Sequence, residues 1–140
     1  MIVDTKKAKY KPSRKRKFKE IRRGTVFSAS TEPRLGVTGI AVDRRGLMFD
    51  DFAIYPIAAE QDVVEWKATI KYGKKTIPRR LGQLAPGSVF RVKGREDKHY
   101  SHGMVCVGAW VYWLHDTSLI SLINPEIEVE WLPEATIILK

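Results

Sequence analysis

An internal repeat constrains the fold of this chain more than any other feature. Residues 18–27 (FKEIRRGTVF) recur as residues 81–90 (LGQLAPGSVF), and each copy closes on Val-Glu-Trp, at 64–66 and at 129–131. The offset is 63 at the glycines and 65 at the tryptophans, so the second copy carries two extra residues. A period this long exceeds that of solenoid repeats and fits a small folded unit duplicated in tandem.

The size of each copy predicts that the two pack against each other. The chain has 140 residues, of which 44% are apolar and 10% aromatic, as in ordinary globular proteins. A copy alone has roughly 50–60 residues, close to the lower limit for independent folding. We therefore expect the copies to share an interface.

The excess positive charge lies at the N-terminus. Residues 1–23 hold eleven basic and two acidic side chains, whereas the rest of the chain is balanced, so the whole net charge of +9 belongs to this segment. Such a block repels itself and stays extended unless an anionic partner neutralises it. The sequence therefore predicts a flexible basic arm that binds an anionic partner.

Short apolar runs separated by glycine-rich turns predict an all-β protein. Phe18 and Ile21, three residues apart, indicate one helical or 3₁₀ turn before the first strand of each copy. Asp43-Arg44-Arg45-Gly46 reads as a tight turn in which Gly46 takes a positive φ. Strands at this spacing favour two tandem, duplicated small β-barrels of SH3-like or OB-like type. The predicted segments are a flexible basic arm at 1–17, copy one at 18–66, a basic linker at 67–80 and copy two at 81–140.

Two basic segments are candidate contacts for nucleic-acid phosphates. The linker repeats the arm's character, with six basic residues and no acidic one. Clustered charge of one sign gives sequence-independent affinity by counterion release. The candidate residues are Lys6, Lys7, Lys9, Lys11, Arg14, Lys15, Arg16, Lys17, Arg22, Arg23, Lys71, Lys74, Lys75, Arg79 and Arg80.

Aromatic side chains near these segments are candidates for stacking on bases. They are Tyr10 in the arm, and Trp110 and Tyr112 in copy two. Alternation along a strand puts Trp110 and Tyr112 on one face, with Val111 and Trp113 on the other. An exposed pair could stack on bases. The alternative is that both faces are buried because the copies pack together.

The remaining polar motifs favour structural roles over catalysis. His99 and His102 are three residues apart, a spacing that points them to opposite faces of a strand, so shared metal ligation is disfavoured. Asp51, matched by Asp116, indicates a turn cap or bulge. Cys106 lies in an apolar run and reads as a buried, inert thiol. No nucleotide-binding or hydrolase motif occurs, so we expect a non-enzymatic protein without cofactor or metal.

The sequence also predicts the compartment. The single cysteine allows no internal disulfide, no apolar segment reaches membrane-spanning length, and no signal peptide follows the basic N-terminus. We expect a protein of the reducing, cytoplasmic interior with no membrane partner.

The opening phrase of each copy resembles that of small uncharacterised bacteriophage accessory proteins with tandem β modules. In that family a Leu-x-x-Leu-x-x-Gly-x-Val-Phe lead-in begins a small β module that ends in a strand rich in Val and Glu. The matching positions here are Phe18, Ile21, Gly24, Val26 and Phe27, and Leu81, Leu84, Gly87, Val89 and Phe90. The resemblance implies a phage or mobile-element accessory protein, located in the host cytoplasm, and brings no catalytic residue with it.

Three functions remain open from the sequence. The leading hypothesis is a non-enzymatic protein that binds DNA or RNA with low specificity, its arm and linker holding phosphates. The alternative is an interaction module that inhibits a host nucleic-acid enzyme or defence system by binding an acidic host protein. A third is a virion-associated structural protein.

Overall fold

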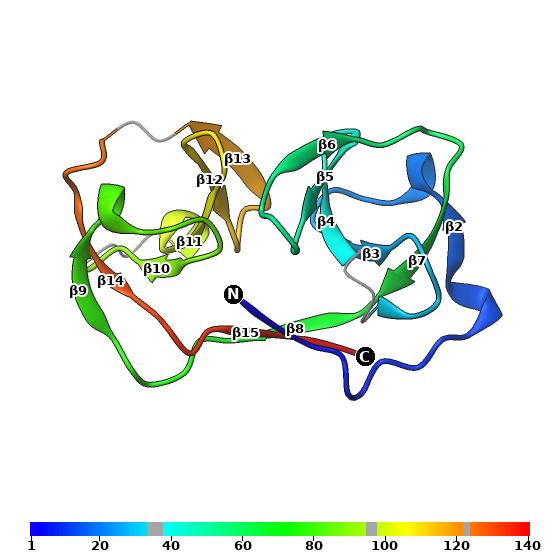
Figure 1. The fold of residues 1–140 in the computed structure, drawn as a ribbon, viewed down its shortest axis with the longest axis horizontal. Helices are drawn as coiled ribbons and strands as arrows, with labels where there is room; N and C mark the ends of the chain where they lie inside the picture. Colours follow the sequence, from blue (N-terminus) through cyan, green and yellow to red (C-terminus); the bar gives the residue numbers. More distant parts are fainter. Residues whose placement is uncertain (34–37, 95–97, 122–123) are drawn as a thin grey trace.

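The computed structural model describes residues 1–33, 38–94, 98–121 and 124–140, and these residues form an all-β protein (Figure 1). Only strands and single 3₁₀ turns occur in the described ranges, which confirms the predicted fold class. The turns are η1 (Pro12–Arg14), η2 (Phe18–Glu20), η4 (Leu81–Gln83) and η5 (Lys98–Tyr100). Turns η2 and η4 stand at the predicted lead-in of each copy.

The strands form two six-stranded sheets, one in each half of the molecule. Sheet one has the order β2 (Lys15–Lys17), β7 (Asp62–Trp66), β3 (Val26–Ser28), β4 (Thr38–Val42), β5 (Arg45–Met48), β6 (Ile54–Pro56). Sheet two has the order β9 (Ile77–Arg80), β14 (Glu128–Trp131), β10 (Val89–Arg91), β11 (His102–Cys106), β12 (Trp110–Trp113), β13 (Ser118–Ser121). Every neighbouring pair within these two sheets is antiparallel.

A third sheet joins the halves. It consists of β1 (Ile2–Asp4), β15 (Thr136–Leu139) and β8 (Ala68–Lys71), with β15 in the middle. Strand β1 runs parallel to β15, and β8 runs antiparallel to it. Because β8 follows sheet one and β15 follows sheet two, each half contributes its last strand to this sheet (Figure 1).

The two halves share one strand order and one set of loop hydrogen bonds. Three backbone N–H···O bonds recur at equivalent places with the same length in both halves. The Phe18 N–H donates to the Gln61 carbonyl in half one as the Leu81 N–H donates to the Ile127 carbonyl in half two, both at 2.9 Å. In the same way Gly24 donates to Ala41 and Gly87 to Val105, both at 2.8 Å. Phe52 donates to Met48 and Thr117 to Trp113, again both at 2.8 Å.

The recurring bonds correct the alignment of the closing strands. In sheet one Phe27 faces Glu65, whereas in sheet two Phe90 faces Trp131. The offset at this strand is therefore 66, and the two Val-Glu-Trp motifs are one residue out of register. Trp66 corresponds to Leu132, and both are 3% exposed. Trp131 is only partly buried, and the guanidinium of Arg79 lies over its ring at 5.9 Å.

A common apolar core holds the halves together, as predicted from their size. It contains side chains of both sheets and of β15, among them Val42, Leu47, Met104, Tyr112 and Ile137. Each sheet has a smaller cluster on its other face, around Phe18 and Phe27 in half one and around Leu81 and Phe90 in half two. Both faces of each sheet are therefore partly buried, the inner one against the other half.

Four further structural expectations are wrong. The described residues contain no closed barrel, because the pairing in each sheet ends at its edge strands. Residues 1–17 are not a flexible arm, since they contain β1, η1 and β2, and residues 67–80 contain β8 and β9 rather than a linker. In the turn after β4 the positive φ values belong to Asp43 (41°) and Arg44 (66°), while Gly46 is a β5 residue.

Candidate nucleic-acid interface and apolar pocket

Seven of the fifteen predicted phosphate-binding residues have partners among the described residues. Strand β2 lies beside β7, which supplies carboxylates: Lys17 Nζ lies 2.8 Å from Asp62, Lys15 Nζ 3.7 Å from Asp62, and Arg16 Nε 3.7 Å from Glu65. The hydrogen bond to Asp62 raises the pKa of Lys17, and the same bond lowers the pKa of Asp62. Exposed pairs of this kind add little stability, but they reduce the field that β2 presents to a partner.

Three further candidates are also engaged. Arg23 lies 4.0 Å from Asp43, and Arg80 lies 3.3 Å from Glu126. Arg79 stacks over Trp131 and donates a hydrogen bond to the carbonyl oxygen of Pro78 at 2.8 Å. Arg79 and Arg80 belong to β9 of sheet two, and Arg23 lies in the loop before β3.

Four exposed lysines of the N-terminal segment lie near one end of the third sheet. Lys6, Lys7, Lys9 and Lys11 occupy the segment between β1 and η1, and no ion pair joins them to any described residue. Both ends of this segment are fixed beside the end of β15. Asp4 faces Ile138 across the sheet, and Arg14 donates a hydrogen bond to the main-chain oxygen of Lys140 at 2.6 Å.

Two lysines that the sequence did not single out complete this surface. The Lys140 N–H donates to the carbonyl oxygen of Lys67 at 2.8 Å, which brings the two residues together. Figure 1 shows the N-terminal segment passing the end of β15 on its way to β2. We call the resulting surface the basic patch, formed by Lys6, Lys7, Lys9, Lys11, Arg14, Lys67 and Lys140.

The segment that carries the basic patch is held against the rest of the protein by several contacts. The Arg14 guanidinium lies 5.3 Å from the centre of the Trp66 ring, and Trp66 Nε1 donates to Ser28 Oγ at 2.7 Å. Ala8 packs against the common core. Asp4 Oδ1 accepts the Lys6 N–H at 3.0 Å. The lysines are therefore carried on a segment held at several points.

The other basic candidates lie away from this patch. Lys71, Lys74 and Lys75 are exposed at the opposite end of β8, where Lys71 faces Thr136 at the start of β15. Arg22 is exposed on the loop that leads into β3. The predicted phosphate-binding residues are thus divided between the basic patch and several separate positions.

Of the three stacking candidates, only Tyr10 is well exposed. Its side chain is 38% exposed and lines a shallow groove with Lys15, Ser30 and Thr31. Tyr112 is 1% exposed in the common core, and Trp110 is partly buried against the same core. The predicted alternation of β12 is confirmed, but its Trp110/Tyr112 face packs inward, so Tyr112 offers no surface to a base.

The histidines belong to a compact cluster beside Tyr72. Tyr72 stacks against His102 with ring centroids 4.3 Å apart, and its hydroxyl lies 3.1 Å from His115 Nε2. His99 instead faces Asp116, at 3.5 Å. No group of three potential His, Cys, Asp or Glu ligands occurs in the part of the chain that the structure describes.

Stability is expected to depend on pH through His102. Burial, with the charges of His115 and Arg91, lowers the His102 pKa below its ordinary 6.5. The folded protein then binds fewer protons than the unfolded chain, so stability falls as pH drops from about 6.5 toward the lowered pKa. Urea midpoints at several pH values from 7.5 to 5 should show this loss, and His102→Gln should reduce it. An unchanged pH dependence in the variant would exclude His102 as the cause.

Two other polar predictions fit the structure. Asp51 Oδ1 accepts the Ala53 N–H at 3.0 Å, the turn capping expected at this position. Cys106 is buried, and burial raises its thiol pKa to about 12, which makes it unreactive at neutral pH.

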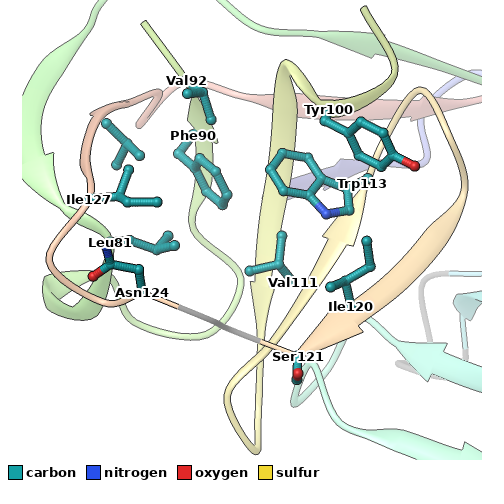
Figure 2. A pocket seen from close by; sticks show the side chains of 11 residues that line it. Leu81, Phe90, Val92, Tyr100, Val111, Trp113, Ile120, Ser121, Asn124 and Ile127 are labelled. Atoms are coloured by element: carbon teal, nitrogen blue, oxygen red, sulfur yellow. The ribbon is translucent and has the colours of Figure 1, made fainter. Parts of the chain in front are cut away.

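The outer face of sheet two contains an apolar pocket that the sequence did not reveal (Figure 2). Its volume is about 300 Å³. Strands β10, β12 and β14 supply its floor, and Ile120 and Ile127 are among its walls. The alternation of β12 predicted two faces for this strand. The pocket is formed by side chains from several strands, so the sequence of β12 alone could not indicate it.

Comparisons of the chain with protein-family models, curated proteins and solved structures find no match. Within the described residues, no helix is long and apolar enough to cross a membrane.

Proposed function

We propose that this protein binds nucleic acid without base specificity, through the basic patch, and acts as a non-enzymatic accessory protein. The observation that carries the proposal is the gathering of seven basic side chains from residues 6–14, 67 and 140 on a folded surface. Such charges bind phosphates and release counterions from DNA or RNA. Fixed lysines lose less conformational freedom on binding than a disordered tail would.

Tyr10 adds a stacking surface beside the patch. It stands between Lys9 and Lys11 and is one of the few large exposed aromatic side chains. Base–aromatic stacking is sequence-tolerant because every base has a π face. The combination of phosphate contacts and one ring supports low-specificity binding of DNA or RNA.

Replacing the four N-terminal patch lysines is expected to weaken binding strongly. Each phosphate contact contributes about −0.9 to the slope of log K against log salt for duplex DNA. If each of the four lysines contacts one phosphate, the variant Lys6→Gln/Lys7→Gln/Lys9→Gln/Lys11→Gln should lose about 3.6 from the slope and bind at least tenfold more weakly near 100 mM salt. Fluorescence anisotropy with a labelled DNA duplex measures both quantities.

A matched control separates the patch from net charge. Lys19→Gln/Arg22→Gln/Arg80→Gln/Lys93→Gln removes the same charge from exposed positions outside the patch. We expect this control to change affinity by less than about threefold. Equal weakening by the two variants, or no binding by the wild-type protein at 20 mM salt, would contradict the proposal.

We also propose that the two halves arose by tandem duplication. The equal strand order and the recurring hydrogen bonds support this, and so does a reciprocal contact between the halves. Gly24 of half one packs on Thr117 of half two, while Gly87 of half two packs on Phe52 of half one. Matched substitutions in the halves should then have similar consequences, which the glycine variants described below test.

A further inference from the structure

The apolar pocket of sheet two has the properties of a small-ligand site. Its floor is formed by side chains whose backbones lie in adjacent strands, so its shape is fixed by the sheet. Figure 2 shows the lining side chains arranged around an open space between β14 and β12. A volume of about 300 Å³ lies at the lower end of the range for ligand pockets.

Aromatic rings form one wall of the pocket. The rings of Phe90 and Trp113 meet edge to face with centroids 5.8 Å apart, and Tyr100 meets Trp113 in the same way at 5.6 Å. These contacts hold the rings in fixed orientations. The pocket therefore presents preformed apolar and aromatic surface rather than loose side chains.

The chemistry of the lining excludes a charged ligand group inside the pocket. No described lining residue carries a charge. The polar side chains of the lining are separated, with Asn124 beside Leu81 and Ile127 and Ser121 near Ile120 (Figure 2). An ion placed among the apolar residues would lose its hydration without compensation.

The corresponding face of half one is packed differently. Gly46 occupies the position of Val111, and a Cβ there would meet the Phe27 ring at 2.9 Å and Met48 Sδ at 3.1 Å. These side chains thus close over the strand. In half two Trp113 stands at the position of Met48 and forms a pocket wall, so the fold alone does not require this cavity.

We propose that this pocket binds a small neutral molecule with one or two fused or linked rings. The ring system gains affinity by burying apolar surface and by contact with the edges and faces of Phe90 and Trp113. A concave, enclosed site favours a small molecule over a protein, which needs about 800 Å² of complementary surface.

Binding of neutral hydrophobic probes tests this proposal. N-phenyl-1-naphthylamine, whose emission increases in apolar sites, is titrated into the full-length protein, and indole is added as a competitor. We expect one equivalent to bind with a dissociation constant of about 100 µM or tighter, and indole to displace it. Ile127→Trp, which fills the pocket from a wall residue that is 38% exposed, should weaken binding at least tenfold.

Gln61→Trp provides the matched control, because Gln61 corresponds to Ile127 in half one. It adds the same indole side chain to half one, away from the pocket of sheet two, and should change affinity by less than twofold. Both variants are first compared by circular dichroism and urea midpoint to establish that they are folded. Absence of saturable binding by the wild-type protein overturns the proposal, and so does equal binding by wild type and Ile127→Trp.

Discussion

A protein that lacks residues 1–17 is expected to be largely unfolded at room temperature. The deletion removes β1, which pairs with β15, and β2, which pairs with β7. Met1, Val3 and Ala8 also pack against the common core. Loss of these contacts exposes apolar side chains of β15 at about 1.5–3 kcal/mol for each one fully uncovered. Several such losses consume much of the 5–15 kcal/mol that stabilises an ordinary domain.

Urea denaturation followed by far-ultraviolet circular dichroism and tryptophan fluorescence measures this effect. The control is the glutamine variant of Lys6, Lys7, Lys9 and Lys11, which keeps the backbone of the segment and should change stability by less than about 1 kcal/mol. A deletion variant with the wild-type midpoint would show that the segment contributes nothing to the fold.

Substitution of Gly87 by alanine is expected to be among the most destabilising single changes. Gly87 has a φ of +90°, and a Cβ there would lie 2.4 Å from Cε2 of the Phe52 ring. Backbone strain and overpacking each cost about 1–3 kcal/mol. Gly24→Ala should act in the same direction, because Gly24 has a φ of +89° and its Cβ would lie 2.5 Å from Cγ2 of Thr117.

The variant Gly94→Ala separates the effect of backbone strain from the effect of overpacking. Gly94 has a φ of +76° but no atom within 4 Å of an added Cβ, so only backbone strain applies. Its urea midpoint should fall by clearly less than that of Gly87→Ala. Equal shifts in the two variants would mean that the contact between the halves is not tight. In the double variant Gly87→Ala/Phe52→Ala, part of the Gly87→Ala loss should be recovered.

The all-β class and the lead-in turn of each half were predicted from the sequence, because both depend on local patterns. The 3₁₀ turns at Phe18 and Leu81, and the strands that follow them, depend on local apolar spacing and on glycines with positive φ. The alignment of Trp66 with Trp131 was wrong because a short motif match carries no information about pairing register. The cross-strand partners of these residues determine that register.

Strand β2 contains no apolar residue that could have indicated a strand. Lys15-Arg16-Lys17 is a charged edge strand, a composition that protects sheet edges from aggregation. Its partners Asp62 and Glu65 lie more than forty residues away, so the sequence alone indicated an arm free to bind. For Tyr112, the alternation of β12 correctly predicted that its side chain shares a face with Trp110. It could not predict whether that face is exposed, and the structure shows that both faces of sheet two are packed.

The basic patch is the central claim, and protection of lysines by bound nucleic acid tests it most directly. The wild-type protein is acetylated briefly at low salt, with and without a DNA duplex, and the modified lysines are measured by mass spectrometry. We predict protection of Lys6, Lys7, Lys9, Lys11, Lys67 and Lys140, with Lys19 and Lys93 unchanged. Protection confined to Lys71, Lys74 and Lys75, or no protection at any lysine, would contradict the account.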